Sequence, residues 1–181
     1  MSAVRTLIKL IDGLNERLGR TLAWLLVALV LVQFSVVVAR YAFSAGSIAW
    51  QESALYLHVM VFMGAAGYTL KHNRHVRVDI FYNRMSPRGR AAVDLFGSLF
   101  LLMPTFGFIL YQSWDYVGRS FALQEASPEV GGLPYVYVIK GFILVLAVTM
   151  ILQGIAQAGR SLMVLSAREG TPAGARPGSR D

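Results

Sequence analysis

The chain has 181 residues, of which 55% are hydrophobic and only 15% are charged, a composition too apolar for an ordinary soluble domain. It contains no cysteine, which excludes a disulfide framework, a thiolate metal site and a cysteine nucleophile. Its net charge of +7 resembles that of a nucleic-acid-binding protein, but the distribution of the charge along the chain favours another explanation.

The first 20 residues predict an amphipathic helix. Apolar residues recur at helical spacing while charged residues occupy the other faces; the apolar ones are Val4, Leu7, Ile8, Ile11, Leu14 and Leu18. The pattern predicts a helix over residues 1–20 that lies on the inner membrane surface and contacts lipid. We favour a basic anchor that fixes topology over the alternative, a cuff that packs under a partner subunit.

Four windows without Asp, Glu, Lys or Arg follow, at residues 21–39, 53–70, 95–114 and 141–159. Each covers about 27–30 Å at about 1.5 Å per residue, which is close to the hydrocarbon thickness of a bilayer. The windows predict an all-α integral membrane protein with four transmembrane helices over residues 21–165.

The basic residues indicate the orientation of these spans. Of the 17 Lys and Arg residues, only Arg40, Arg119 and Lys140 lie in or beside the first and third connections. The others lie before the first span, in the second connection or in the tail, and such segments stay in the cytoplasm. Both termini are therefore predicted to be cytoplasmic, and because the basicity is a topology signal, no nucleic-acid partner is expected.

The first connection is short and predicts an antiparallel hairpin that brings Arg40 and Glu52 to the same outer boundary. Two alternatives remain open for these charges: they pair with each other, or Glu52 pairs with a basic group of a partner. Trp50 lies where an aromatic-belt residue is expected.

The remaining elements have local signals of their own. In the second span, the small residues 64–67 predict close packing against a helix of this chain or of another protein. Residues 75–80 alternate in polarity and predict an extended loop. Ser86-Pro87 predicts the start of the third helix, and Pro104 predicts a bend within it. Residues 166–181 lack apolar periodicity and predict a disordered cytoplasmic tail.

The chain offers little for catalysis or ion conduction. His58 is the deepest titratable residue, and we interpret it as a hydrogen-bonded helix residue rather than a proton relay. His72 and His75 are too few for a metal site and lie among basic residues. No catalytic residue, metal site or cofactor is expected. The alternatives, a small four-helix membrane enzyme and a self-assembling channel, require convergent polar residues inside the bundle or a polar stripe along one span, and we identify neither.

The chain nevertheless carries an ordered set of short motifs: Arg40-Tyr41-Ala42-Phe43, Ile48-Ala49-Trp50-Gln51-Glu52, Phe62-Met63-Gly64-Ala65-Ala66, His75-Val76-Arg77-Val78-Asp79, Ser127-Pro128-Glu129, Leu133-Pro134, Lys140 and Leu152-Gln153-Gly154. These motifs together resemble a known family, the small membrane (Q-type) subunit of tripartite ATP-independent periplasmic (TRAP) transporters. Their order and spacing cover nearly the whole chain except the tail.

The resemblance implies a multi-pass protein of the bacterial inner membrane that is not an enzyme. It implies two partners, a large TRAP permease subunit and a periplasmic solute-binding protein, in a sodium-coupled system for organic acid uptake. The substrate and sodium sites are then expected on the large subunit, with this chain as a scaffold. Candidate interface or structural residues are Arg40, Trp50, Glu52, His75, Arg77 and Asp79, and Glu125 and Glu129 are candidates for docking the binding protein.

Overall fold

The computed structural model of the chain describes residues 2–75 and 82–167. Every regular element within these residues is a helix, and four of the helical segments are long and apolar enough to cross a membrane. The prediction of an all-α membrane protein with four spans is confirmed. Most of the predicted extended loop, including Arg77 and Asp79, and nearly all of the predicted tail lie outside the described residues.

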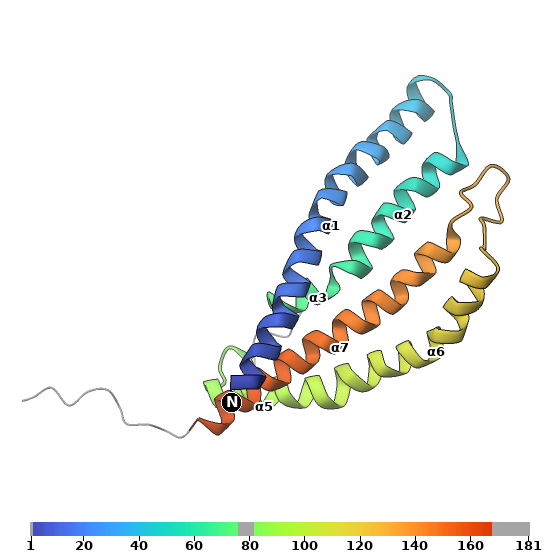
Figure 1. Cartoon of the computed structure of the whole chain (residues 1–181). Helices are drawn as coiled ribbons and strands as arrows, with labels where there is room; N and C mark the ends of the chain where they lie inside the picture. The colour runs from blue at the N-terminus through green and yellow to red at the C-terminus, as the bar shows by residue number, and fades with distance from the viewer. Residues whose placement is uncertain (1, 76–81, 168–181) are drawn as a thin grey trace, which may run out of the picture.

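The first helix, α1 (Ser2–Ala42), runs without a break through 41 residues. At about 1.5 Å per residue it is roughly 60 Å long, about twice the hydrocarbon thickness of a bilayer. The helix expected over residues 1–20 is therefore continuous with the first span (Figure 1). Its location on the inner membrane surface stays a prediction.

The second span consists of α2 (Ile48–Gly64) and α3 (Ala66–Lys71), which are separated by a single turn at Ala65. Its small residues pack inside this chain: a Cβ atom on Gly64 would lie 2.6 Å from Leu22 of α1. A Cβ atom on Gly67 would lie 3.0 Å from the Cβ atom of Thr149 in the last helix. The close packing that the sequence predicts therefore joins the second span to both of these helices.

The third span begins with α5 (Pro87–Phe96), where the Ser86 hydroxyl accepts a hydrogen bond from the Gly89 backbone at 3.2 Å. It continues as a π-helical segment, η1 (Gly97–Leu102), and then as α6 (Met103–Ala122). Pro104 has no N–H group and so deprives the carbonyl four residues earlier of its helical donor, which explains a wider turn at this place. The span is visibly bowed in Figure 1, as the proline predicts.

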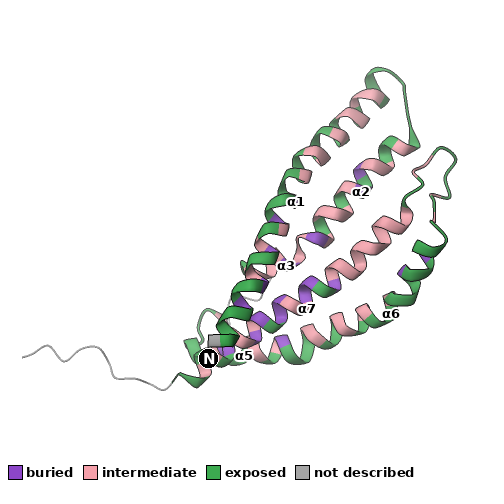
Figure 2. Cartoon of the chain, viewed as in Figure 1, coloured by how far each residue is buried: buried purple, intermediate pink, exposed green. Residues whose placement is uncertain are grey.

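The last helix, α7 (Val136–Ser166), lies in the middle of the bundle and contacts all the other helices of the described chain. We call the end where α1 begins and α7 ends the terminal end, and the opposite end the loop end (Figure 1). Buried residues gather toward the terminal end, where α1 and α7 converge, as Figure 2 shows. In α7 they all lie between Ala147 and Ser161.

Candidate functional site

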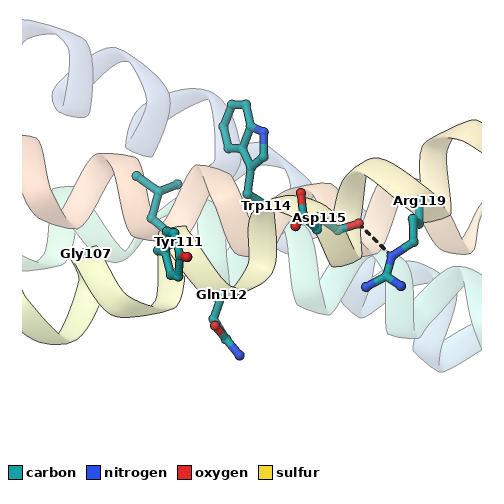
Figure 3. Close-up of a pocket in the computed structure, with 7 residues that line it drawn as sticks. Gly107, Tyr111, Gln112, Trp114, Asp115 and Arg119 are labelled. Carbon is teal, nitrogen blue, oxygen red and sulfur yellow. Dashed lines mark hydrogen bonds between the residues drawn. The ribbon is translucent and has the colours of Figure 1, made fainter.

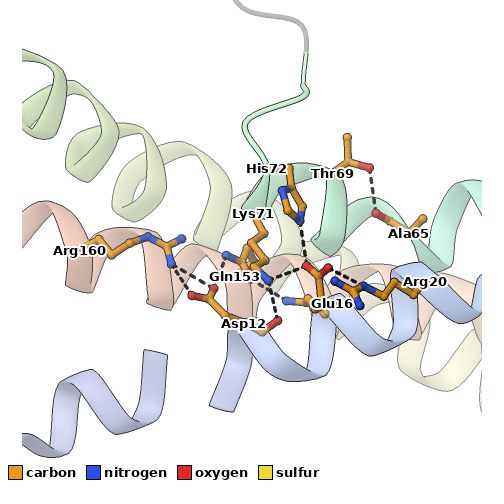
Figure 4. Close-up of polar contacts among 10 residues, drawn as sticks. Asp12, Glu16, Arg20, Ala65, Thr69, Lys71, His72, Gln153 and Arg160 are labelled. Atoms are coloured by element: carbon orange, nitrogen blue, oxygen red, sulfur yellow. Dashed lines mark hydrogen bonds and ion pairs between the residues drawn. The ribbon is translucent and has the colours of Figure 1, made fainter. Parts of the chain in front are cut away.

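A set of polar side chains connects α1 to α3 and α7 toward the terminal end (Figure 4). We call it the inner polar cluster; its members are Asp12, Asn15, Glu16, Arg20, Lys71, His72, Gln153 and Arg160. Four of them come from the first 20 residues of the chain: Asp12, Asn15 and Glu16 contact α3 or α7, and the exposed Arg20 contacts Glu16. The cluster is thus built where the sequence predicts a surface helix.

The deepest pair in this cluster is Asn15 and Gln153, which are 1% and 0% exposed. Nδ2 of Asn15 donates to Oε1 of Gln153 at 2.7 Å, and Nε2 of Gln153 donates to Asp12 at 3.1 Å. Buried amides need hydrogen-bond partners, so this bond fixes the register of α1 against α7, while Oδ1 of Asn15 has no partner among the described residues.

The charged members surround that pair. Nη1 of Arg160 lies 3.0 Å from both carboxylate oxygens of Asp12, which links α7 to α1. Glu16 accepts from Lys71 at 2.7 Å and lies 2.9 Å from Nε2 of His72, which links α1 to the end of the second span. Both acidic residues of the N-terminal segment therefore have partners within the chain.

A smaller set of contacts extends this arrangement to the third span. Asp94 of α5 accepts from the Tyr82 hydroxyl at 2.8 Å and from Nε2 of Gln157 in α7 at 3.2 Å. All four spans are thus joined at or near the terminal end through polar side chains.

This cluster corrects one expectation from the sequence. The helical pattern places the charged residues of this segment, including Asp12 and Glu16, on faces away from the apolar stripe, and it predicts no convergent polar group. The structure instead turns both acids toward α3 and α7. One signal was available: Asn15 continues the line of Ile8 and Ile11 at helical spacing, and all three residues are buried. By contrast Val4, Leu7 and Leu14 of the predicted stripe are exposed.

A second polar contact closes the loop end of the bundle, and we call it the outer clasp. Glu52, in the first turns of α2, accepts a hydrogen bond from the Leu133 backbone at 2.6 Å and another from the Ser127 hydroxyl. The backbone lies so close that a Cβ atom on Gly132 would be 2.9 Å from the Glu52 carboxylate. One carboxylate therefore holds the α6–α7 connection against α2.

This geometry differs from the ion pair that the sequence left open. Arg40 is exposed near the end of α1, and within the described residues it forms no ion pair with Glu52. Trp50 is 44% exposed, as a residue facing lipid or a partner would be, and His75 is exposed. The roles expected for these residues stay predictions.

The two acids considered for docking have different surroundings. Glu125 pairs with Lys140 at 2.5 Å and accepts from the Ser120 hydroxyl at 2.7 Å, whereas Glu129 is exposed. The hydrogen bond from the Lys140 ammonium, with that from Ser120, holds the pKa of Glu125 below its usual range. The charged Glu125 carboxylate is therefore paired within the chain.

The described residues form several open hollows on the surface of the bundle. A hollow of about 520 Å³ is lined by residues of α6 alone, among them Gly107, Tyr111, Trp114 and Asp115 (Figure 3). Arg119 donates to the backbone oxygen of Asp115 at 3.3 Å within the same helix. Among the described residues no group of three or more His, Asp or Glu side chains is placed to hold a metal ion.

Four apolar helices with polar contacts at both ends define a multi-pass membrane protein. The family model described as "Tripartite ATP-independent periplasmic transporters, DctQ component" matches residues 29–163, and the chain belongs to this family. It is therefore a transporter component of the inner membrane and not an enzyme.

A named relative agrees with this assignment. The chain is 29% identical over 111 residues to the ectoine TRAP transporter small permease protein TeaB of Halomonas elongata. The match covers 60% of this chain and 57% of the relative, so the chain spans a little over half the length of that protein.

Proposed function

We propose that this chain acts as a static scaffold that braces the large permease subunit of a TRAP transporter. The observation that carries the proposal is the way the chain uses its polar groups. The buried pair Asn15 and Gln153 and the acids Asp12 and Glu16 bind partners within the chain, and together they connect the helices at one end of the bundle. Such contacts suit a body that keeps its shape while a neighbouring subunit moves.

The outer surface supports the same proposal. Many large apolar side chains of the first and third spans are exposed, including Trp24, Phe34 and Phe100 at 75%, 66% and 66%. In a membrane these side chains face lipid or another subunit. A scaffold needs such a surface, whereas a channel needs polar groups facing a continuous path.

The finer parts of the proposal rest on the family resemblance. The system takes up an organic acid with sodium and a periplasmic binding protein, and the substrate and sodium sites lie on the large subunit. The exposed tip of the α6–α7 connection, with Glu129, contacts the binding protein, and the basic N-terminal segment contacts lipid headgroups. TeaB is named for ectoine, but the solute handled with this chain would be set by the other subunits.

Co-expression tests the scaffold. The tagged chain is purified from membranes that contain the large permease subunit of the same organism, and uptake is measured with and without this chain. We expect the two proteins to purify together and uptake to fail without the small subunit. Independent purification combined with intact uptake would overturn the proposal. Ion conduction by the purified chain alone would favour the channel.

A further inference from the structure

Three polar side chains are exposed on the membrane-spanning part of the α1–α2 hairpin: Gln33 on α1, and Gln51 and His58 on α2. They line two adjoining hollows between these helices, of about 540 and 260 Å³, which share both glutamines. The hollows therefore form one groove that runs from His58 toward the loop end of the bundle, where Arg40 borders it.

The amides and the imidazole in this groove have no hydrogen-bond partner among the described residues; the His58 ring only stacks on Phe62, with 6.2 Å between centroids. Two of these side chains lie well below the membrane edge. Gln33 is about 13 Å from the end of α1, and His58 about 15 Å from the start of α2, at the usual rise per residue. Hydrocarbon offers such groups nothing to bind, whereas a neighbouring helix does.

The charge at the rim of the groove has a definite sign. Arg40 is exposed and forms no ion pair within the described chain, because Glu52, the acid expected beside it, binds Ser127 and Leu133 instead. The sequence left open a partner with a basic group for Glu52. In the structure the charge without a counterion is instead the Arg40 guanidinium, so the matching group on a partner is a carboxylate.

We propose that this groove receives one transmembrane helix of the large permease subunit, which places a carboxylate beside Arg40 and a hydrogen-bonding side chain against Gln33 and His58. This inference rests on the proposed function and adds the face on which the partner sits. Lipid tails cannot satisfy the amides. Two copies of this chain paired groove to groove in the same orientation would bring their Arg40 side chains together, which like-charge repulsion disfavours.

The outer face of α6 gives a matched comparison. Gln112 lies ten residues before that helix ends, a depth similar to that of Gln33, and it is also exposed. The charges nearby, Asp115 and Arg119, are opposite in sign and stand four residues apart on one helix, a spacing at which such side chains can interact. This face therefore does not require a partner's charge.

Cross-linking distinguishes the two faces. The chain has no cysteine, so Gln33→Cys and Gln112→Cys each give one attachment point for a benzophenone reagent. After illumination of membranes that contain both subunits, we expect a product of the combined mass from position 33 and little from position 112. A dimer of this chain at position 33, a stronger product at position 112, or no product at either position would overturn the inference.

A second measurement does not depend on the reagent. Gln33→Leu combined with His58→Leu should lower the amount of large subunit that co-purifies about fivefold to tenfold, since each lost interhelical hydrogen bond is modest. Arg40→Glu should lower it as well, and Gln112→Leu should not. Thermal unfolding of each purified variant, expected to match the parent, shows that the fold is kept. Unchanged co-purification in the groove variants would show that the large subunit does not bind in the groove, and it would not contradict the scaffold role. Failure of the parent chain to co-purify would contradict the scaffold role itself.

Discussion

The backbone N–H of Leu133 donates to Oε2 of Glu52 at 2.6 Å, across 81 residues of sequence. The Ser127 hydroxyl donates to the other oxygen of the same carboxylate. Glu52 therefore organises the connection between the third and fourth spans, although it belongs to the second. The outer clasp is a contact within the chain, and its loss should be measurable without any partner.

Glu52→Ala should lower the midpoint temperature of unfolding by several degrees, because it leaves the Leu133 N–H and the Ser127 hydroxyl without their acceptor. Glu52→Gln keeps one oxygen acceptor and should lower the midpoint temperature less than Glu52→Ala does. It should still weaken assembly or uptake, without changing which solute is preferred. Limited proteolysis of residues 123–135 should be faster in both variants than in the parent, and faster in Glu52→Ala than in Glu52→Gln. Glu129→Gln is the control, because that side chain is exposed. Equal melting temperatures in all these variants would contradict the role of Glu52.

Asn15→Leu should destabilise the purified protein by about 1–3 kcal/mol, since the buried Oε1 atom of Gln153 loses its donor. Adding Gln153→Leu removes the orphaned group and should restore part of the loss, because Asp12 keeps Arg160 as a partner. A double-mutant cycle from denaturant unfolding measures this coupling. Gln112→Leu, on an exposed face, should change little. Additive losses would show that the two amides do not act as a pair.

Gly67→Ala should cost about 1–3 kcal/mol through overpacking, because the new Cβ atom would lie 2.6 Å from the Asn15 side chain. Gly107→Ala is the matched control: nothing lies within 4 Å of the added atom, and alanine favours the helix by up to about 1 kcal/mol. Thermal unfolding of both variants provides the comparison. A larger loss at position 107 than at position 67 would contradict the packing described above.

Acid should weaken the contact between Glu125 and Lys140. The folded protein lowers the pKa of Glu125 below the ordinary value of 4.5, so its charged form stabilises the fold. That stability is complete above the ordinary pKa and is lost as the pH falls through the lowered value. Glu125→Gln should therefore reduce the acid-dependent drop in melting temperature, whereas Glu129→Gln should leave it nearly unchanged. Identical pH profiles for the parent and Glu125→Gln would argue against the contact.

Much of the fold follows from hydropathy alone. Each predicted window lies within one of the four helical spans, because a charge-free run of this length has few stable alternatives to a transmembrane helix. The extent of the helices was less predictable. The pattern of residues 1–20 does not show that this helix continues into the first span, and its contacts with α7 are visible only in the structure.

The polar contacts were harder to predict than the spans. Asp12 and Arg160 are 148 residues apart, and Glu16 and Lys71 are 55 apart, so no local periodicity relates them. The helical pattern also places Asp12 and Glu16 on faces away from the apolar stripe. The sequence singles out Glu52 as a charge that needs a partner, and in the structure Glu52 accepts from a backbone N–H group, which no side-chain pattern reveals.

The uneven burial along the bundle has a consequence for its motions. At the terminal end, α1 and α7 enclose buried residues such as Ile11 and Ala156, whereas the first residues of α7 at the loop end, 136–146, are only partly buried. Local opening costs less free energy where fewer buried contacts are broken. In the isolated chain, backbone amides near the loop end should exchange with solvent deuterium sooner than those near residue 153. A neighbour that covers the loop-end half would slow this exchange and make the two halves more nearly equal in stability.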